Sequence, residues 1–242
     1  MRYGIIADIH SNLEAFEEVL EHLKGEVDQI VCAGDVVGYN PNPNECCEII
    51  IKNKILTVAG NHDFAVAGKI DVSFFNLLAQ SAISWTSSVI RPENLEFLKN
   101  LPIHLEFDDF EVVHGSLRNN LEEYIIARDV AYASFEMMKK PLLFVGHTHK
   151  PALLFLSNKG SEGFLIKGEG TFPVRDIGKV ILNAGSVGQP RDGDPRAGYI
   201  IYDSEKKEAS VFRTSYDVQA VQDRMLKAGF PGSLVERLRI GF

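Results

Sequence analysis

The sequence contains little cysteine and no excess of basic residues. Its three cysteines, Cys32, Cys46 and Cys47, are an odd number without zinc-finger spacing, which argues against a disulfide framework and against a cysteine metal site. Lys and Arg number 25 against 33 Asp and Glu, and the net charge of −8 argues against a broad nucleic-acid-binding surface, which needs a basic field. Phosphorylated small molecules are not excluded, because bound divalent cations make an acidic pocket locally positive.

Long apolar runs are also missing. No run approaches the length that spans a membrane, and the first expected strand begins almost at Met1, which leaves no room for a signal peptide. We therefore expect a cytoplasmic protein without a membrane association. There is no internal repeat, low-complexity segment or linker, so we expect a single domain, 1–242, with a sizeable core.

The sequence does contain a recurring pattern, in which an apolar run ends on residues of metal-binding type. The run 55–59 leads into Gly60-Asn61-His62-Asp63. Four further runs, 5–7, 30–34, 110–113 and 142–146, lead into Asp8-Ile9-His10, Asp35, His114-Gly115 and His147-Thr148-His149. Each run is typical of a strand that enters a polar loop. Because open α/β sheets bind ligands at the carboxyl ends of their strands, we expect these ends to form one site.

The segments between these runs predict alternating strands and helices in the first half. Ser11-x-x-Glu14 has the pattern of a capping box and precedes an apolar stripe at helical spacing that stops near Gly25. With strands at 5–7 and 29–33, this predicts a parallel βαβ unit. Further helices are expected over 45–52, 73–90 and 121–140, with a short one from Pro92 that ends before Pro102, and a hairpin should join 103–107 to 110–113.

Beyond His149 the helical signal fades. Short strands are predicted at 153–156, 163–167, 179–182, 198–202 and 209–213, followed by closing helices at 217–228 and 234–240. We therefore expect a wound α/β first half and a second half that supplies a strand-rich second sheet.

The polar strand ends indicate a metal site more strongly together than apart, since each motif alone also fits a helix start, a turn or a buried histidine. Asp8 and His10 are two residues apart, as are His147 and His149, and such pairs share a face. Imidazole, carboxylate and amide ligands without thiolate suit Mn, Fe, Zn, Ni or Co better than a structural zinc site. The ligands exceed the needs of one tetrahedral ion, and a carboxylate-bridged pair of ions explains the surplus. Such a pair is typical of hydrolases that act on phosphoryl groups.

The ordered motifs between residues 8 and 149 resemble those of the calcineurin-like metallophosphoesterase superfamily. The run Asn183 to Arg191 resembles the branch of small bacterial and archaeal phosphodiesterase-like members. The resemblance implies an α/β fold, a four-layer αββα sandwich of two mixed β-sheets flanked by helices, with the metals at one rim.

The resemblance also implies roles for single residues. One ion would be held by Asp8, His10, Asp35 and His149, and the other by the bridging Asp35 with Asn61, His114 and His147. His62 would be catalytic, as the general acid that protonates the leaving oxygen. From its position next to His62, Asp63 is expected either to orient that ring or to take part in a turn or helix start. The implied cofactors are two divalent metal ions, with Mn favoured and Fe, Zn, Ni, Co and Mg as alternatives.

The chain departs from the phosphoprotein phosphatases of the superfamily after Gly34-Asp35. Those enzymes continue with an Asp-Arg pair that orients the acid histidine and holds phosphate, whereas this chain reads Val36-Val37-Gly38-Tyr39. The candidates for binding phosphate are therefore the loop arginines Arg118, Arg191 and Arg196, each of which could equally be solvated.

We expect a metal-dependent phosphoesterase, and favour a phosphodiesterase that acts on a small phosphorylated substrate. The alternatives are a phosphomonoesterase or pyrophosphohydrolase with the same site, and a non-catalytic scaffold of the kind found in a retromer subunit. That scaffold lacks the acid histidine, so the presence of His62 favours an enzyme. No oligomeric state is predicted.

Overall fold

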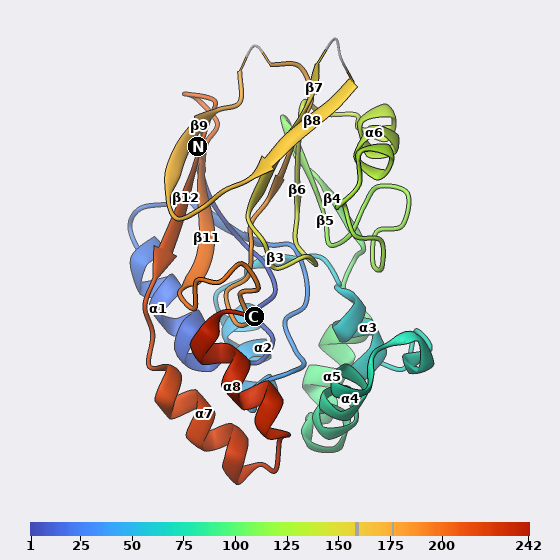
Figure 1. Cartoon of the computed structure of the whole chain (residues 1–242), viewed down its shortest axis with the longest axis vertical. Helices are drawn as coiled ribbons and strands as arrows, with labels where there is room; N and C mark the ends of the chain where they lie inside the picture. Colours follow the sequence, from blue (N-terminus) through green and yellow to red (C-terminus); the bar gives the residue numbers. More distant parts are fainter. Residues whose placement is uncertain (158–159, 176) are drawn as a thin grey trace.

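The apolar runs of the sequence become the central strands of two six-stranded sheets, described in a computed structural model over residues 1–157, 160–175 and 177–242 (Figure 1). The first sheet contains, in spatial order, β3 (Leu56–Thr57), β2 (Gln29–Cys32), β1 (Arg2–Ile6), β11 (Ala197–Asp203), β12 (Glu208–Thr214) and β9 (Gly170–Pro173). The second contains β4 (His104–Glu106), β5 (Phe110–Val113), β6 (Leu142–Val145), β10 (Val180–Asn183), β7 (Ala152–Ser157) and β8 (Gly160–Leu165).

Both sheets are mixed. In the first, β1, β2 and β3 are parallel, and β11 is antiparallel to β1. In the second, β5, β6 and β10 are parallel, with β4 and β7 antiparallel beside them. The parallel strands therefore bring the polar segments that follow β1, β2, β3, β5 and β6 to one rim of the sandwich.

The side-chain alternation of the strands separates two apolar layers. Ile5 pairs with Val31 and faces the second sheet, where it joins the cluster that includes Phe110 and Phe144. The next residue, Ile6, points the opposite way and packs with helices α1 (Leu13–Leu23) and α2 (Pro43–Lys52). Helix α6 (Arg128–Met137) covers the outer face of the second sheet. The four-layer αββα prediction is confirmed (Figure 1).

The remaining helices gather at the rim to which the parallel strands point (Figure 1). They are α3 (Asn61–Val66), the 3-10 turn Val72–Phe74, α4 (Leu77–Val89), α5 (Pro92–Lys99), α7 (Val218–Lys227) and α8 (Gly232–Ile240). Helices α4, α7 and α8 share one apolar cluster, which also contains Tyr39 from the loop after β2. The C-terminal helices therefore pack beside that loop. None of the helices within the described residues has the length and apolarity needed to cross a membrane.

The prediction that the second half of the chain supplies the second sheet by itself is wrong. Strands β9, β11 and β12 extend the first sheet, while β4, β5 and β6 from the first half join the second. The reason is that β1 is apolar on both faces and lies inside the sheet, so that its free edge pairs with β11 in antiparallel register from Arg2 to Ile5. Strand β9 was not predicted at all.

Several predicted boundaries also change. The strand expected over 55–59 is reduced to Leu56–Thr57, and the helix expected over 121–140 is reduced to Arg128–Met137. Ser11 does not cap α1. Asn12 does so, because its Oδ1 accepts a hydrogen bond from the Ala15 N–H at 3.2 Å, while Ser11 N donates to Val36 O.

Candidate metal centre

The proposed ligands converge in the loops that follow the parallel strands. Their side chains come from the β1–α1, β2–α2, β5–α6 and β6–β7 loops and from the first residue of α3, and all are buried: Asp8, His10, Asp35, Asn61, His114, His147 and His149. Five of these residues have φ between 47° and 68°, namely Asp8, His10, Asp35, His147 and His149. Non-glycine residues adopt this left-handed conformation at a cost in free energy, and such residues cluster at functional sites.

The ligand atoms form two groups that share Asp35. In each group the atoms lie within 4.8 Å of one another, the first containing Asp8, His10, Asp35 and His149 and the second Asp35, His114 and His147. Asn61 adjoins the second group, because its Oδ1 lies 3.2 Å from His114 Nε2. The structure thus brings together every predicted ligand, in the two sets that the resemblance implied.

The histidines of the first group point unprotonated nitrogens at one another. His10 Nδ1 lies 3.0 Å from Val37 O, and His149 Nδ1 lies 2.6 Å from Gln189 O. A carbonyl only accepts hydrogen bonds, so each Nδ1 carries the hydrogen and each Nε2 of a neutral ring carries a lone pair. Burial lowers the pKa of both rings well below the usual value, which keeps them neutral. The two Nε2 atoms are 3.2 Å apart, so their lone pairs face each other, and a cation bound between them would stabilise this arrangement.

The second group has the same construction. His114 Nδ1 lies 2.8 Å from Ala33 O and His147 Nε2 lies 3.0 Å from Glu122 O, so His114 Nε2 and His147 Nδ1 face each other at 3.1 Å. Burial lowers the pKa of His147 to about 3. Burial also lowers that of His114, but the Asp35 carboxylate outweighs this and raises the pKa to about 9. In the metal-free protein a proton therefore occupies the place of a cation, and metal binding would release it.

Asp35 lies at the junction of the two groups. Its Oδ2 is buried without a hydrogen-bond partner among the described residues, and it lies 3.4 Å from His10 Nε2 and 3.3 Å from His114 Nε2. Its Oδ1 accepts a hydrogen bond from the His62 N–H at 2.9 Å. A buried carboxylate oxygen without a hydrogen bond needs positive charge beside it, which either the protonated His114 ring or a bound cation supplies. The donor set and this orphaned oxygen fit a pair of divalent cations bridged by Asp35.

Close backbone contacts hold the ligand loops together. A Cβ atom at Gly60 would lie 2.0 Å from Asp35 Oδ1, and one at Gly188 would lie 1.8 Å from Ile9 O, so only glycine fits at either position. The Asn183–Arg191 run also supplies Ser186, whose Oγ donates to Asp8 O at 2.8 Å. This run therefore holds in place the loop that carries Asp8 and His10.

His62 lies beside the first group. Its ring packs against His10 and Tyr39, with centroid separations of 4.9 and 4.5 Å, and its Nδ1 is buried without a partner in the described part of the chain. Burial lowers the pKa of His62 to about 4. Asp63 does not orient this ring. Its carboxylate accepts from Gly60 N at 2.9 Å and Val37 N at 3.1 Å and so starts α3, which is the alternative role considered for it.

Of the arginine candidates, Arg191 is the one that the structure brings to the centre. Arg118 forms an ion pair with Glu123, and Arg196 forms one with Asp194 at 2.7 Å. Arg191 Cζ lies 5.5 Å from the Tyr39 ring centroid, and its Nη2 donates to Gln189 Oε1 at 2.8 Å, while its buried Nε has no partner among the described residues. Its charge also contributes to the lowered pKa values of His10 and His149, after the larger effect of burial.

Three residues near the centre were not predicted. Tyr39 packs on His62, and Tyr124 stacks on His147 with ring centroids 3.9 Å apart and nearly parallel planes. Arg237 of α8 lies near Arg191, and burial followed by the charge of Arg191 lowers its pKa. Tyr39 follows Asp35 closely enough in sequence to have been a candidate, but it stands in a segment interpreted as a turn. Arg237 lies in a distant helix that carries no motif.

Removal of divalent metal should lower the melting temperature of the protein. A ligand that binds only the folded state at 100 times its Kd stabilises it by about 2.7 kcal/mol, which corresponds to about 5–10 °C in a chain of this size. We expect a fall of this order for each ion that EDTA removes, and recovery on addition of Mn. Differential scanning calorimetry with elemental analysis of the same samples measures both. An unchanged melt after verified metal removal would contradict the two clusters.

Comparisons with known proteins identify the family of the chain. Residues 1–207 match the model of the calcineurin-like phosphoesterase superfamily domain. An uncharacterized protein of Methanocaldococcus jannaschii is 39% identical over 244 residues, which cover 98% of this chain and 97% of the relative. The crystal structure of a metallophosphoesterase from Sphaerobacter thermophilus is 40% identical and superposes with a TM-score of 0.89 over 100% of this chain and 99% of that one. A hypothetical protein from Pyrococcus horikoshii, 20% identical, shares the fold with a TM-score of 0.81 over 100% and 98% of the two chains. The chain therefore belongs to the calcineurin-like phosphoesterase superfamily.

Proposed function

We propose that this protein is a metal-dependent phosphoesterase that hydrolyses small phosphodiesters. The observation that carries the proposal is the unpartnered Oδ2 of Asp35, which lies between two groups of inward-facing histidine nitrogens. Such a donor set is suited to holding two cations a short distance apart, as in metal-dependent phosphoester hydrolysis. Membership of the phosphoesterase superfamily supports the same reaction class.

The ligands divide between two divalent ions. Asp8, His10, Asp35 and His149 would hold one ion, and Asp35, Asn61, His114 and His147 would hold the other. We favour Mn, with Fe, Zn, Ni, Co and Mg as alternatives. When bound, the ions would neutralise the phosphoryl oxygens and lower the pKa of the attacking water. The backbone carbonyls of Val37, Gln189, Ala33 and Glu122 fix the orientation of the four imidazoles.

His62 is the proposed general acid. Its ring lies next to His10 without contributing to either ligand group, so it is free to donate a proton to the leaving oxygen. Because burial lowers its pKa to about 4, His62 would take up a proton only when a negatively charged substrate lies beside it.

A preference for diesters follows from charge. A diester has one negative charge at phosphorus, whereas a monoester has up to two. The stretch from Val36 to Tyr39 lacks the Asp-Arg pair of the phosphoprotein phosphatases, and Arg191 is the candidate arginine that lies at the centre. Because this protein supplies fewer positive groups to the phosphoryl oxygens than the phosphoprotein phosphatases do, the diester, which carries less negative charge than the monoester, is the favoured substrate.

Arg191→Gln should weaken phosphodiester hydrolysis through substrate binding. A hydrogen bond to a charged group is worth about 1.5–3 kcal/mol, so kcat/KM should fall by about 10- to 150-fold. Arg196→Gln is the matched control, because Arg196 is already paired with Asp194, and it should retain near-normal activity. Equal losses in the two variants, measured by steady-state kinetics, would contradict the assignment of Arg191.

The reaction class is tested with two chromogenic substrates. We expect bis-p-nitrophenyl phosphate to be hydrolysed with a higher kcat/KM than p-nitrophenyl phosphate, and only in metal-loaded protein. A preference for the monoester would favour a phosphomonoesterase with the same centre. Hydrolysis of neither ester, with release of phosphate from pyrophosphate, would indicate a pyrophosphohydrolase. No turnover of any of these by protein with verified metal content would support the scaffold.

A further inference from the structure

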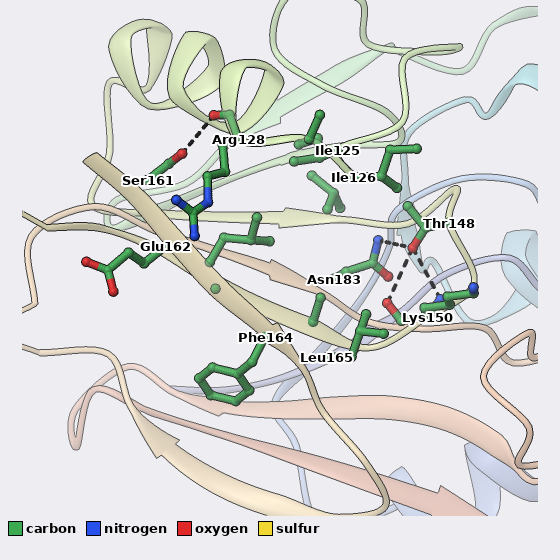
Figure 2. A pocket seen from close by; sticks show the side chains of 15 residues that line it. Ile125, Ile126, Arg128, Thr148, Lys150, Ser161, Glu162, Phe164, Leu165 and Asn183 are labelled. Carbon is green, nitrogen blue, oxygen red and sulfur yellow. Dashed lines mark hydrogen bonds between the residues drawn. The ribbon is translucent and has the colours of Figure 1, made fainter. Parts of the chain in front are cut away.

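A cavity of about 390 Å³ lies on the outer face of the second sheet, between α6, β7 and β8 (Figure 2). Ile125 and Ile126 form one side, and Phe164 and Leu165 of β8 form the opposite side. Its size is within the range of small-molecule sites, and none of the residues lining it is a proposed metal ligand.

The cavity and the metal centre share a wall. Thr148, which lines the cavity, stands between the ligands His147 and His149 in sequence. Asn183 holds it in place, since its Nδ2 donates to Thr148 Oγ1 at 3.0 Å and also to Gly146 O (Figure 2). The residues that position a metal ligand therefore also form one end of the cavity.

The segment before α6 makes a second connection. Glu122 O accepts from His147 Nε2 at 3.0 Å, and the Tyr124 ring stacks on His147. The next two residues, Ile125 and Ile126, line the cavity. This is why the helix expected from residue 121 begins only at Arg128. Tyr124, which stacks on the ring of a proposed metal ligand, is therefore the chain neighbour of the cavity residue Ile125.

The lining combines apolar side chains with two cations and one carboxylate, that of Glu162, which accepts a hydrogen bond from Ser157 Oγ. Leu154, Ile125, Phe164 and Leu165 provide apolar surface, while Arg128 and Lys150 also line the cavity (Figure 2). Neither cation forms an ion pair with a carboxylate of the described residues, although most of the described arginines elsewhere do, and the protein as a whole carries a charge of −8. A ligand with both an apolar part and a negative charge would complement this lining.

We propose that this cavity binds the organic group of the phosphodiester, and that this group is large, combines an apolar ring face with polar groups and carries a further anionic group, as a nucleoside phosphate does. The inference rests on the proposed function, because it assigns the substrate class of the same centre. The apolar residues bind the organic part, and Arg128 and Lys150 bind its negative charge.

The test compares three p-nitrophenyl diesters that differ only in the second ester group: methyl, thymidine 5′, and thymidine 5′ with a 3′-phosphate. We expect kcat/KM to rise by about tenfold or more from the methyl ester to the thymidine ester, since burial of an apolar group discriminates by this order. A further rise is expected with the 3′-phosphate. Equal values for all three would overturn the proposal, while hydrolysis of the methyl ester would leave the proposed function standing.

Point variants at the cavity test which residues produce the preference for the thymidine esters. Ile126 is 80% exposed at the cavity, and Leu226 on α7 is 57% exposed outside its lining, so Ile126→Asp and Leu226→Asp form a matched pair on the surface. Ile126→Asp should remove most of the preference for the thymidine esters and retain methyl ester hydrolysis, whereas Leu226→Asp should change neither. Lys150→Gln should remove only the gain from the 3′-phosphate, with Lys227→Gln as its control. If Ile126→Asp keeps the preference for the thymidine esters and Lys150→Gln keeps the gain from the 3′-phosphate, the cavity does not bind the organic group.

Binding provides a readout that does not depend on catalysis. Isothermal titration of thymidine 3′,5′-bisphosphate into the EDTA-treated protein should show binding that Ile126→Asp and Lys150→Gln weaken about tenfold and that the two controls retain. If no ester is hydrolysed but this binding is found, the proposed function fails and the cavity stands. If the bisphosphate binds equally to all variants, or not at all, the cavity assignment fails.

Discussion

Asp35→Asn is expected to deplete both metal sites and to lower phosphodiester hydrolysis by more than about 10³-fold, since loss of even one electrostatic stabiliser costs about 10²–10³. Asp35 is the residue that the two ligand groups have in common, and its Oδ2 lies between His10 and His114. An amide at this position cannot supply the negative charge that a bridging ligand provides. Elemental analysis of the purified variant measures the metal content, and steady-state kinetics measures the activity.

Two further variants distinguish a bridging role of Asp35 from a general loss of metal binding that any substitution at the rim would cause. Asn61 adjoins only the second group, so Asn61→Ala should weaken one ion and retain the other. Asp71 is an exposed carboxylate that caps the 3-10 turn, and Asp71→Asn should leave both ions in place. The amide of Asp35→Asn still offers an oxygen to the His62 N–H, which favours retention of the local fold. Two tightly held ions in this variant would show that Asp35 does not bridge.

His62→Ala should retain both ions and lose much of its activity on substrates with poor leaving groups. General acid catalysis contributes about 10²–10⁴-fold, and its effect is greatest when the departing oxygen is basic. We therefore expect a loss of this size on an alkyl phosphodiester and a far smaller loss on a p-nitrophenyl diester, whose leaving group needs no proton. The comparison of kcat/KM for both substrates measures the difference.

The control for His62 is a histidine outside the centre. His22 of α1 contacts Tyr199 and Thr214 instead, and His22→Ala should affect both substrates little. Equal losses of His62→Ala on the alkyl and p-nitrophenyl diesters, or the disappearance of an ion, would mean that His62 is not the acid.

Much of the metal centre was predictable because its ligands follow strands. The runs that end at Asp8, Asp35 and His114 are apolar enough to define buried parallel strands, and parallel strands bring their carboxyl ends to the same rim. The pairing of β4 with β5 was likewise evident from clean alternation and a short turn. In these cases local pattern and tertiary structure agree.

Other features depend on contacts that no local pattern contains. The residues before Arg128 leave the expected helix because Glu122 O binds His147 and Tyr124 stacks on the same ring. Strand β3 is short because the chain leaves β2 soon after Thr57: Val58 N still donates to Cys32 O of β2, but Ala59 N donates to Pro102 O outside the strand pair. The membership of β11 in the first sheet depends on a pairing between Arg2 and Asp203, at opposite ends of the chain.

The three candidate arginines also could not be told apart from local sequence, because their roles depend on contacts made in the fold. Arg118 and Arg196 have carboxylates five and two residues away in the chain, and these local partners take up their charge. Arg191 has no such neighbour in an ion pair within the described residues and instead lies over Tyr39, which is distant in sequence. Asp192 and Asp194 follow Arg191 closely in sequence, but they pair with Arg213 and Arg196. A search for nearby acidic residues would therefore not have separated Arg191 from the other two, and the packing of the β2–α2 loop places it at the centre.

The most direct test of the central claim is anomalous diffraction from crystals of the protein grown with Mn. We expect two anomalous peaks with the Asp35 carboxylate between them. One should lie among Asp8, His10, Asp35 and His149, and the other among Asp35, Asn61, His114 and His147. The two peaks should be roughly 3.5–4 Å apart. A single peak, or peaks that do not share Asp35, would contradict this claim.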